Sequence, residues 1–212
     1  MPTQPPRLYY IHDPMCSWCW GFRKTWLAIK QQLPESIQLT TLVGGLAPDS
    51  TQPMPDSMQQ YLQSAWKKIQ QTIPGTEFNF DFWTRNTPRR STYPACRAVV
   101  AAKKLAQKEQ EITFGIQQAY YLQAQNPSDL DTLIAVASEI GLDQQAFTDL
   151  MNSSEIHDLF ADELQQCRDL GINSFPSLAL QIKGRLHGIA IDYNSADAAL
   201  SQINSLVNHN AA

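Results

Sequence analysis

The sequence predicts an α/β protein in which two parts of one sheet are separated by a large α-helical insertion. Three observations support this prediction. A β-favouring run, an amphipathic helix and a second β-favouring run follow one another up to residue 43. Helical patterns then fill residues 51–170, and β-favouring runs return only after Pro176. The expected order is therefore β-α-β, the insertion, and β-β-α.

The N-terminal β-α-β unit begins with an apolar run, Leu8–Ile11, which an Asp-Pro pair interrupts. Runs of this type indicate a buried strand. A helix that ends near Pro34 is predicted next, because apolar residues recur at spacings of three and four: Phe22, Trp26, Ile29 and Leu33. A second strand is predicted at residues 37–43, before a pair of glycines ends the run.

The insertion is predicted from helical stripes of apolar residues. Six segments have this pattern: 58–69, 95–105, 112–123, 129–140, 144–151 and 156–170. Ser128 is expected to cap the fourth of them. We therefore divide the chain into one domain formed by residues 1–50 and 171–212 and an inserted α-helical subdomain formed by residues 51–170.

The C-terminal part has the pattern of a hairpin followed by a helix. Ser177–Ile182 and Arg185–Ile189 are short β-favouring runs on either side of a Lys-Gly pair, which is suited to a tight turn. Ser195 is expected to cap a final helix whose apolar face is formed by Ala199, Leu200, Ile203 and Leu206.

Composition limits the classes of function. The 212 residues are 43% hydrophobic and carry a net charge of -4 without a basic run, which argues against nucleic acid or an anionic membrane as the main partner. No apolar span of membrane length and no signal-peptide pattern is found, so a cytoplasmic location is expected. Cytosolic thiols are kept reduced, so a close pair of cysteines there is more often catalytic than structural.

Cys16 and Cys19 form such a pair, separated by Ser17-Trp18 at the predicted junction of strand and helix. Unpaired N–H groups and the positive end of the dipole favour an anion at a helix N-terminus, so a thiol there loses its proton more readily. Cys16 is therefore predicted to be the exposed nucleophile. Cys19, one turn later and facing inward, is predicted to resolve a mixed disulfide on Cys16.

A zinc site is the structural alternative for two cysteines at this spacing, but it needs further ligands. Only Cys96 and Cys167 remain, and neither belongs to a second close pair, so no metal is predicted. Both are expected to be small buried hydrophobic residues. His12 either tunes Cys16 electrostatically or has a structural role. No glycine-rich phosphate loop is present, so no tightly bound cofactor is expected.

Three segments carry a resemblance to a known family: Pro14–Phe22, Tyr93–Ala98 and Gly171–Ser177. Together they resemble the DsbA-like thioredoxin superfamily, and most of all its cytoplasmic FrnE-like branch. That branch is similar in turn to chromene-carboxylate isomerases and kappa-class glutathione transferases. The resemblance implies a thioredoxin fold and a thiol-disulfide oxidoreductase of the protein disulfide reductase or isomerase class.

The resemblance also implies a cis proline at Pro176, in a loop that faces the dithiol, with Phe175 offering backbone groups to an extended thiol substrate. From the residues alone a trans bond would be favoured, because cis isomers are a small minority of X-Pro bonds. The candidate substrate-binding residues are Met15, Trp18, Trp20 and Phe175.

The aromatic residues have two interpretations. Trp18 and Trp20 either form an apolar platform beside the reactive sulfur or pack in the core. A surface role is favoured for Trp18, whereas both roles stay open for Trp20. Trp26, Trp66 and Trp83 lie in helical patterns and are predicted to pack in the core.

The predicted partners are disulfide-containing or thiol-containing proteins and peptides, with glutathione or another thiol as co-substrate. The first alternative is a glutathione-dependent isomerase or transferase, in which Cys16 only positions the sulfur of glutathione. In that related group the first cysteine position is typically serine, so the intact pair counts against it. The second alternative is a binding protein for unfolded chains. A cytoplasmic setting favours reductase or isomerase over net oxidase activity.

Overall fold

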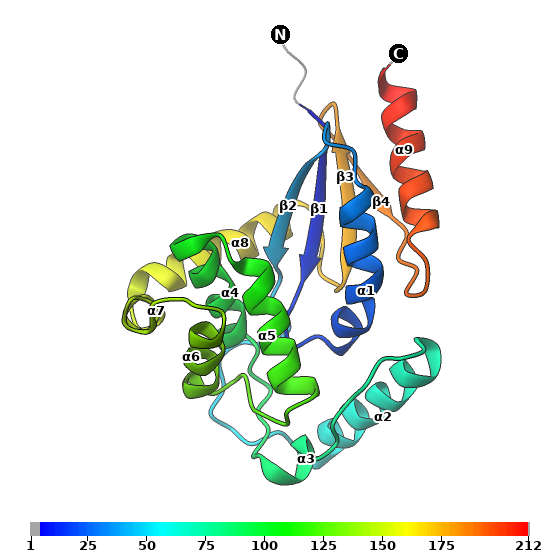
Figure 1. Ribbon diagram of the computed structural model, residues 1–212. Helices are drawn as coiled ribbons and strands as arrows, with labels where there is room; N and C mark the ends of the chain where they lie inside the picture. Colours follow the sequence, from blue (N-terminus) through cyan, green and yellow to red (C-terminus); the bar gives the residue numbers. More distant parts are fainter. Residues whose placement is uncertain (1–4, 212) are drawn as a thin grey trace.

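The computed structural model describes residues 5–211, so the outer ends of the predicted domain, residues 1–4 and 212, lie outside the described part. The order of elements is the predicted one (Figure 1). The first unit consists of β1 (Arg7–His12), α1 (Ser17–Gln32) and β2 (Gln38–Val43). The last consists of β3 (Ser177–Ile182), β4 (Arg185–Ile189) and α9 (Asp197–Ala211).

Helices connect β2 to β3. Their bounds are α2 (Asp56–Thr72), α3 (Phe82–Arg85), α4 (Tyr93–Ala106), α5 (Glu109–Tyr121), α6 (Leu130–Glu139), α7 (Gln144–Met151) and α8 (Ser154–Asp169). All six predicted segments are helical. The single-turn helix α3 is additional, and it is too short to show a repeating apolar pattern in the sequence.

Two predicted helix caps have different outcomes. Ser195 lies one residue before the N-cap position, which Ala196 occupies, but its hydroxyl accepts a hydrogen bond from the backbone N–H of Asp197, the first residue of α9 (3.0 Å). The prediction for Ser128 is wrong. Asp129 occupies the N-cap position of α6, and the Ser128 hydroxyl instead donates a hydrogen bond to the carbonyl of Ser91 (2.7 Å).

The sheet has the strand order β2-β1-β3-β4. β1 is parallel to β2 and antiparallel to β3, and β3 forms the predicted hairpin with β4. Lys183 and Gly184 both have positive φ (49° and 78°), as a two-residue hairpin turn requires. His12 is the last residue of β1 and pairs with Val43, because the parallel ladder extends one residue beyond the predicted strand.

Helices cover both faces of the sheet (Figure 1). Side chains alternate between the faces of a strand, so Leu8 and Tyr10 pack in one apolar cluster with residues of α1 and α9. Tyr9 and Ile11 lie in another, which includes Cys167 of α8. Both faces of β1 are therefore buried, as its continuous apolar run indicates.

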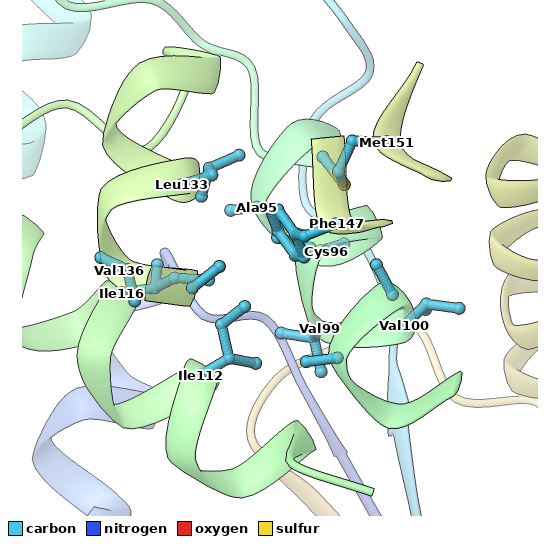
Figure 2. Packing of buried hydrophobic residues seen from close by; sticks show 14 of the residues in the cluster. Ala95, Cys96, Val99, Val100, Ile112, Ile116, Leu133, Val136, Phe147 and Met151 are labelled. Atoms are coloured by element: carbon cyan, nitrogen blue, oxygen red, sulfur yellow. The ribbon is translucent and has the colours of Figure 1, made fainter. Parts of the chain in front are cut away.

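The core of the insertion forms around α4, as Figure 2 shows. This helix contributes Ala95, Cys96, Val99 and Val100 to a cluster that also contains Ile112, Ile116, Leu133, Val136, Phe147 and Met151 from α5, α6 and α7. Small side chains on α4 allow these helices to approach closely. Val43, at the end of β2, belongs to the same cluster and connects it to the sheet.

A third core is aromatic. Trp66 of α2 lies against Phe78 and Trp83, with ring centroids 4.8 and 5.0 Å away. Trp20 belongs to this cluster too, so it connects α1 to the insertion. Trp26 is buried between α1 and the sheet. The predicted packing of Trp26, Trp66 and Trp83 is therefore confirmed.

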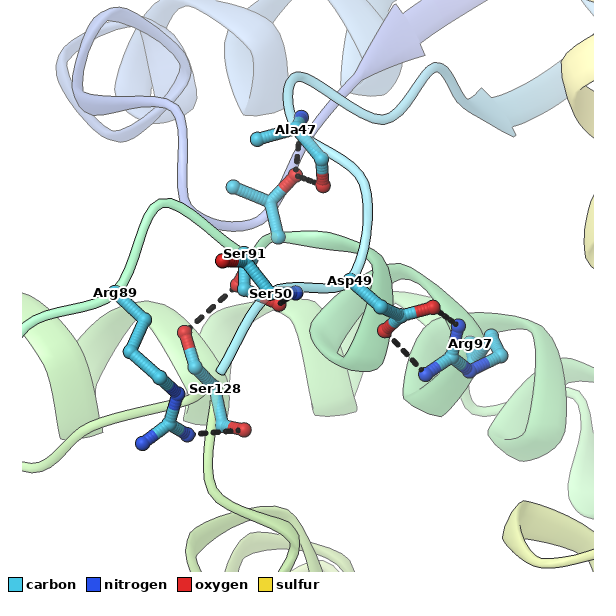
Figure 3. Close-up of polar contacts among 8 residues, drawn as sticks. Ala47, Asp49, Ser50, Arg89, Ser91, Arg97 and Ser128 are labelled. Atoms are coloured by element: carbon cyan, nitrogen blue, oxygen red, sulfur yellow. Dashed lines mark hydrogen bonds and ion pairs between the residues drawn. The ribbon is translucent and has the colours of Figure 1, made fainter. Parts of the chain in front are cut away.

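Polar contacts fix the loop that leaves β2 against the start of α4 (Figure 3). The guanidinium of Arg97 donates two hydrogen bonds of 2.8 Å to the carboxylate of Asp49. The N–H of Ser50 donates to the hydroxyl of Ser91 (3.2 Å), and Arg89 donates to the carbonyl of Ser128 (2.9 Å).

None of the helices in residues 5–211 combines the length and apolar character needed to cross a membrane.

Candidate active site

Cys16 lies at the N-cap position of α1, directly after the turn that follows β1. Its backbone is extended (φ -79°, ψ 114°), and its N–H donates to the carbonyl of Asp13 (3.0 Å). The sulfur is thus carried at the helix end where backbone N–H groups are unpaired and the dipole is positive. This is the predicted junction of strand and helix. Cys16 and Cys19 are both free thiols.

Cys16 is less exposed than the sequence predicts. Only 6% of its surface is accessible, against 0% for Cys19. The order of exposure matches the prediction, but the description of Cys16 as an exposed cysteine is wrong. The loop before β3 lies over the Cys16 sulfur and reduces its exposure. The sequence alone does not indicate that this loop reaches Cys16.

Phe175 supplies the contact from that loop. The Cys16 thiol donates a hydrogen bond to the Phe175 carbonyl, with the sulfur 3.5 Å from the oxygen. The antiparallel pairing of β3 with β1 places Ser177 opposite Ile11, which brings the loop to the end of β1 where the dithiol lies. The peptide bond between Phe175 and Pro176 is cis, which confirms the expected geometry.

Cys19 remains a protonated thiol at neutral pH. Burial, together with the hydrogen bond that its thiol makes to Cys16, raises the pKa of Cys19 well above the usual thiol value. The two sulfurs are therefore distinguished by position and environment. Cys16 lies at the helix end beside the substrate loop, and Cys19 lies one turn further along and fully buried.

Asp13 is a further site residue, which from the sequence alone is expected only to end the first strand. Its carboxylate is fully buried and accepts hydrogen bonds from the N–H of Met15, the N–H of Leu46 and the hydroxyl of Thr92, each at 2.7 Å. Burial raises its pKa even against these hydrogen bonds. The sequence shows that Asp13 is an acidic residue close to the dithiol, and this could have marked it as a candidate site residue. Its hydrogen-bond partners Leu46 and Thr92 are distant in the sequence, so these contacts could not be predicted.

Cys96 is one of those partners. Its thiol donates to the Asp13 carboxylate, with 3.5 Å between sulfur and oxygen. Burial and the nearby Asp13 raise its pKa well above the usual thiol value. Burial likewise raises the pKa of Cys167 to about 11. Both thiols are buried, as predicted.

His12 does not provide a positive charge to the site. It is 2% exposed and its ring stacks on Tyr10, with 5.0 Å between centroids. Burial, and secondly the charge of Lys103, lower its pKa from 6.5 to about 4. The imidazole is neutral at neutral pH, so this placement favours the structural role of His12 over electrostatic tuning of Cys16.

His12 makes the stability of the fold depend on pH. As the pH falls, the unfolded chain binds a proton at His12 near pH 6.5, whereas the folded protein does so only near pH 4. Protons therefore favour unfolding in this window, and about 3 kcal/mol of stability should be lost between pH 7 and pH 4 through His12. Urea unfolding across this range should show a smaller loss in His12→Gln. The exposed His209→Gln is the control, and equal pH slopes in the two variants would contradict the assignment.

The candidate aromatic residues differ in exposure. Trp18 is partly exposed and packs against Tyr193, with ring centroids 5.0 Å apart. Trp20 is 1% exposed, stacks on Tyr121 and donates its indole N–H to the carbonyl of Glu77 (3.0 Å). Its burial favours the core role over a surface platform. Met15 lies half-buried beside a small hollow that Arg90 also lines.

No group of three or more potential histidine, cysteine or carboxylate metal ligands occurs within residues 5–211. The functional side chains that do gather are thiols and one carboxylate. The arrangement is suited to sulfur chemistry, because a thiol at a helix N-terminus faces a loop carbonyl and has a second thiol behind it.

Gly44 determines where Phe175 can lie. A Cβ atom added at Gly44 would be 2.0 Å from the ring of Phe175, so Gly44→Ala must displace that ring. We expect a loss of about 1 to 3 kcal/mol in unfolding free energy, together with faster alkylation of Cys16 by iodoacetamide. Gly188→Ala is the matched control, since nothing lies within 4 Å of its added Cβ. A Gly44→Ala protein that equals this control in both measurements would show that the contact is unimportant.

Comparison with known proteins identifies the class. Residues 9–186 match the model of a family described as thioredoxin. This match covers most of the chain, and the chain belongs to the thioredoxin family. Its mixed four-stranded sheet with a large helical insertion is the α/β thioredoxin-like fold that the sequence predicts.

Particular relatives share nearly the whole fold. A candidate protein disulfide isomerase from Nitrosomonas europaea is 26% identical, with a TM-score of 0.84 over 97% of this chain and 98% of that chain. The cytosolic disulfide reductase DsbM from Pseudomonas aeruginosa is 25% identical, with a TM-score of 0.76 over 96% and 99%. A structure of DsbM with GSH is 23% identical, with a TM-score of 0.74 over 95% and 99%.

A curated relative has a different described role. The ClpXP adapter protein SpxH from Halalkalibacterium halodurans is 22% identical over 180 residues, which cover 82% of this chain. The match spans 58% of the length of SpxH.

Proposed function

We propose that this protein is a thiol-disulfide oxidoreductase in which Cys16 is the nucleophile and Cys19 is the resolving thiol. One observation carries the proposal. The Cys16 thiol lies at the N-terminus of α1, 3.5 Å from the carbonyl of Phe175, and the buried Cys19 lies one turn behind it. Membership of the thioredoxin family supports the same chemistry.

The proposed reaction consists of two thiol-disulfide exchanges. The Cys16 thiolate attacks one sulfur of a substrate disulfide, which forms a mixed disulfide and releases the other substrate sulfur as a thiolate. Cys19, which is fully buried, passes its proton to the first substrate thiolate as that thiolate departs, and then attacks Cys16. The Cys16–Cys19 disulfide forms and the second substrate thiolate leaves. Two external thiols reduce the pair again and become a disulfide themselves.

The substrate loop and Trp18 have binding roles in this proposal. Phe175 and Pro176 shape one side of the groove beside the sulfur, where an extended thiol substrate displaces the hydrogen bond between Cys16 and the Phe175 carbonyl. Trp18, partly exposed on α1, provides apolar surface on the same helix turn. Met15 is the remaining contact, whereas the buried Trp20 supports the helix from within.

Glutathione is the proposed reducing thiol, and the DsbM structure with GSH supports this choice. We place the protein in the cytoplasm and in the FrnE-like branch, as a reductase or isomerase rather than a net oxidase. The description of DsbM as a cytosolic disulfide reductase supports this setting. Disulfide-containing proteins and peptides are the proposed substrates.

The first test is the redox equilibrium of the pair. Purified protein is equilibrated in glutathione buffers of increasing oxidation, and its thiols are alkylated and counted by mass spectrometry. We expect one reversible disulfide between Cys16 and Cys19, with a reduction potential between about -270 and -120 mV. Cys96 and Cys167 should stay reduced throughout. The absence of this bond at every buffer ratio would overturn the proposal.

The Cys19→Ser variant separates the proposal from the glutathione-dependent isomerase or transferase. Disulfide reduction needs the resolving thiol, so its turnover should collapse in Cys19→Ser. An isomerisation that uses only Cys16 to position glutathione should survive. Full turnover of a glutathione-dependent isomerisation in this variant, without disulfide reduction in the unaltered protein, would favour the isomerase.

A further inference from the structure

A cavity of about 490 Å³ lies between α1 and α5, over the surface of β1 and β2. Figure 1 shows α5 beside α1, with these strands behind them. Neither Cys16 nor Cys19 is among the residues that line it, so it is distinct from the substrate groove proposed above. Its volume is within the range of sites for small organic molecules.

The floor of this cavity is aromatic. His12 and Tyr10 of β1 stack with 5.0 Å between centroids, and Tyr10 stacks on Trp26 of α1 at 4.1 Å. The interplanar angles are 11° and 22°, so three nearly parallel rings form a continuous series. Phe114 of α5 is 45% exposed and contributes another ring to the lining. Such a lining favours an occupant with a flat apolar body.

Two buried polar atoms of the lining have no hydrogen-bond partner within residues 5–211. One is Nδ1 of His12, a side chain that is almost completely buried at the floor. The other is Oε2 of Glu109, in the first turn of α5. An unpaired buried polar atom costs about 1 to 3 kcal/mol, and most such atoms in native proteins have a partner. Both atoms belong to residues that line the same cavity, which points to an occupant that hydrogen-bonds them.

Opposite charges line the two walls. Arg23 and Lys30 project from α1, whereas Glu109 and Glu111 are in the first turn of α5. The Arg23 guanidinium lies 3.5 Å from the centre of the Trp20 ring and donates one hydrogen bond, to the Trp20 carbonyl. A guanidinium has five N–H donors, so others remain for a ligand. The cavity thus offers donors on one wall and acceptors on the other.

We propose that this cavity binds a small zwitterion with an aromatic body, the chemistry of an aromatic amino acid or a dipeptide that contains one. The ring packs between the aromatic floor and Phe114, and the N–H of an indole ring donates to Nδ1 of His12. The carboxylate accepts hydrogen bonds from Arg23, and the ammonium group donates to Glu109. A ligand with one of these charges alone would leave the opposite wall unpaired.

Calorimetric titration with four probes tests the assignment. L-tryptophan and the dipeptide Gly-Trp carry both charges, tryptamine lacks the carboxylate, and indole-3-propionate lacks the ammonium group. We expect saturable binding of at least one zwitterion and binding about ten-fold weaker or more for each single-charge analogue, because hydrogen bonds to charged groups contribute about this much. No saturable binding of either zwitterion, or equal binding of a single-charge analogue, would overturn the proposal.

Variants locate the binding within the molecule. Glu109→Gln should weaken zwitterion binding about ten-fold while indole-3-propionate is unaffected. Glu139→Gln is the matched control, because Glu139 is exposed on α6 and does not line the cavity. The double variant Cys16→Ser/Cys19→Ser should bind as the unaltered protein does. Loss of binding in the double variant, or an equal effect of both glutamate variants, would place the ligand elsewhere and contradict the proposal.

Discussion

Replacing Cys16 with serine should lower the rate of disulfide reduction by about 10³-fold or more, because a hydroxyl group cannot replace the thiolate that attacks the substrate. Cys19→Ser should instead stop the reaction after its first step. Cys16 then retains the substrate half as a mixed disulfide, since the sulfur that would release it is missing. Reduction of a glutathionylated peptide, followed by mass spectrometry of the intact protein, measures both effects.

Cys167→Ser is the control for these cysteine variants. Cys167 is also a buried thiol, but it lies on α8 and donates only a weak hydrogen bond to the carbonyl of Val43, at 4.0 Å. Its replacement should leave the reduction rate within about two-fold of the unaltered protein after correction for folded fraction. A mixed disulfide trapped on Cys19 in the Cys16→Ser variant would reverse the assigned roles, and a full rate of disulfide reduction in Cys16→Ser would refute them.

Truncation of Trp66 to alanine should have the largest effect on stability, about 3 to 5 kcal/mol of unfolding free energy. The Trp66 side chain is almost fully buried, and six aromatic rings surround it: Phe78, Phe80, Phe82, Trp83, Tyr120 and Tyr121. These rings come from separate segments of the insertion, so no single neighbour can fill the cavity. Urea unfolding, followed by circular dichroism, measures the loss.

Tyr61→Ala is the matched control on the same helix. Tyr61 is 67% exposed, so its truncation should change the unfolding free energy by no more than about 0.5 kcal/mol. A loss below about 1.5 kcal/mol for Trp66→Ala would show that the aromatic cluster rearranges to fill the space. The cluster would then be a looser support for α1 than its packing indicates.

Periodicity in the sequence predicts the elements of this fold well because most of them bury one face. The helix at 144–151 is predicted with the bounds of α7, and the hairpin around Lys183 is found where the Lys-Gly pair indicates. The additional helix α3 has a single turn, so no repeat could reveal it. Ser128 fails as a cap because α6 begins at Leu130, so Asp129 and not Ser128 occupies the N-cap position.

The candidate site is predictable only where its residues are neighbours in the sequence. The dithiol and its position at the start of a helix follow from local pattern, and Pro176 follows from a family resemblance. The limited exposure of Cys16, the neutral state of His12 and the hydrogen bonds of Asp13 depend on distant segments. Single-sequence periodicity carries no information on which loops meet, so these features required the structure.

The pairing of β1 with β3 sets an order of events during synthesis. Val43 completes the first β-α-β unit, but the segment that covers Cys16 is synthesised only when the chain reaches Phe175. At ordinary elongation rates this interval lasts about 10 s. Throughout it the nascent chain carries both sulfurs without the Phe175 carbonyl beside them. The Cys16–Cys19 pair is therefore accessible to cellular oxidants and thiols before the segment that contains Phe175 has been synthesised.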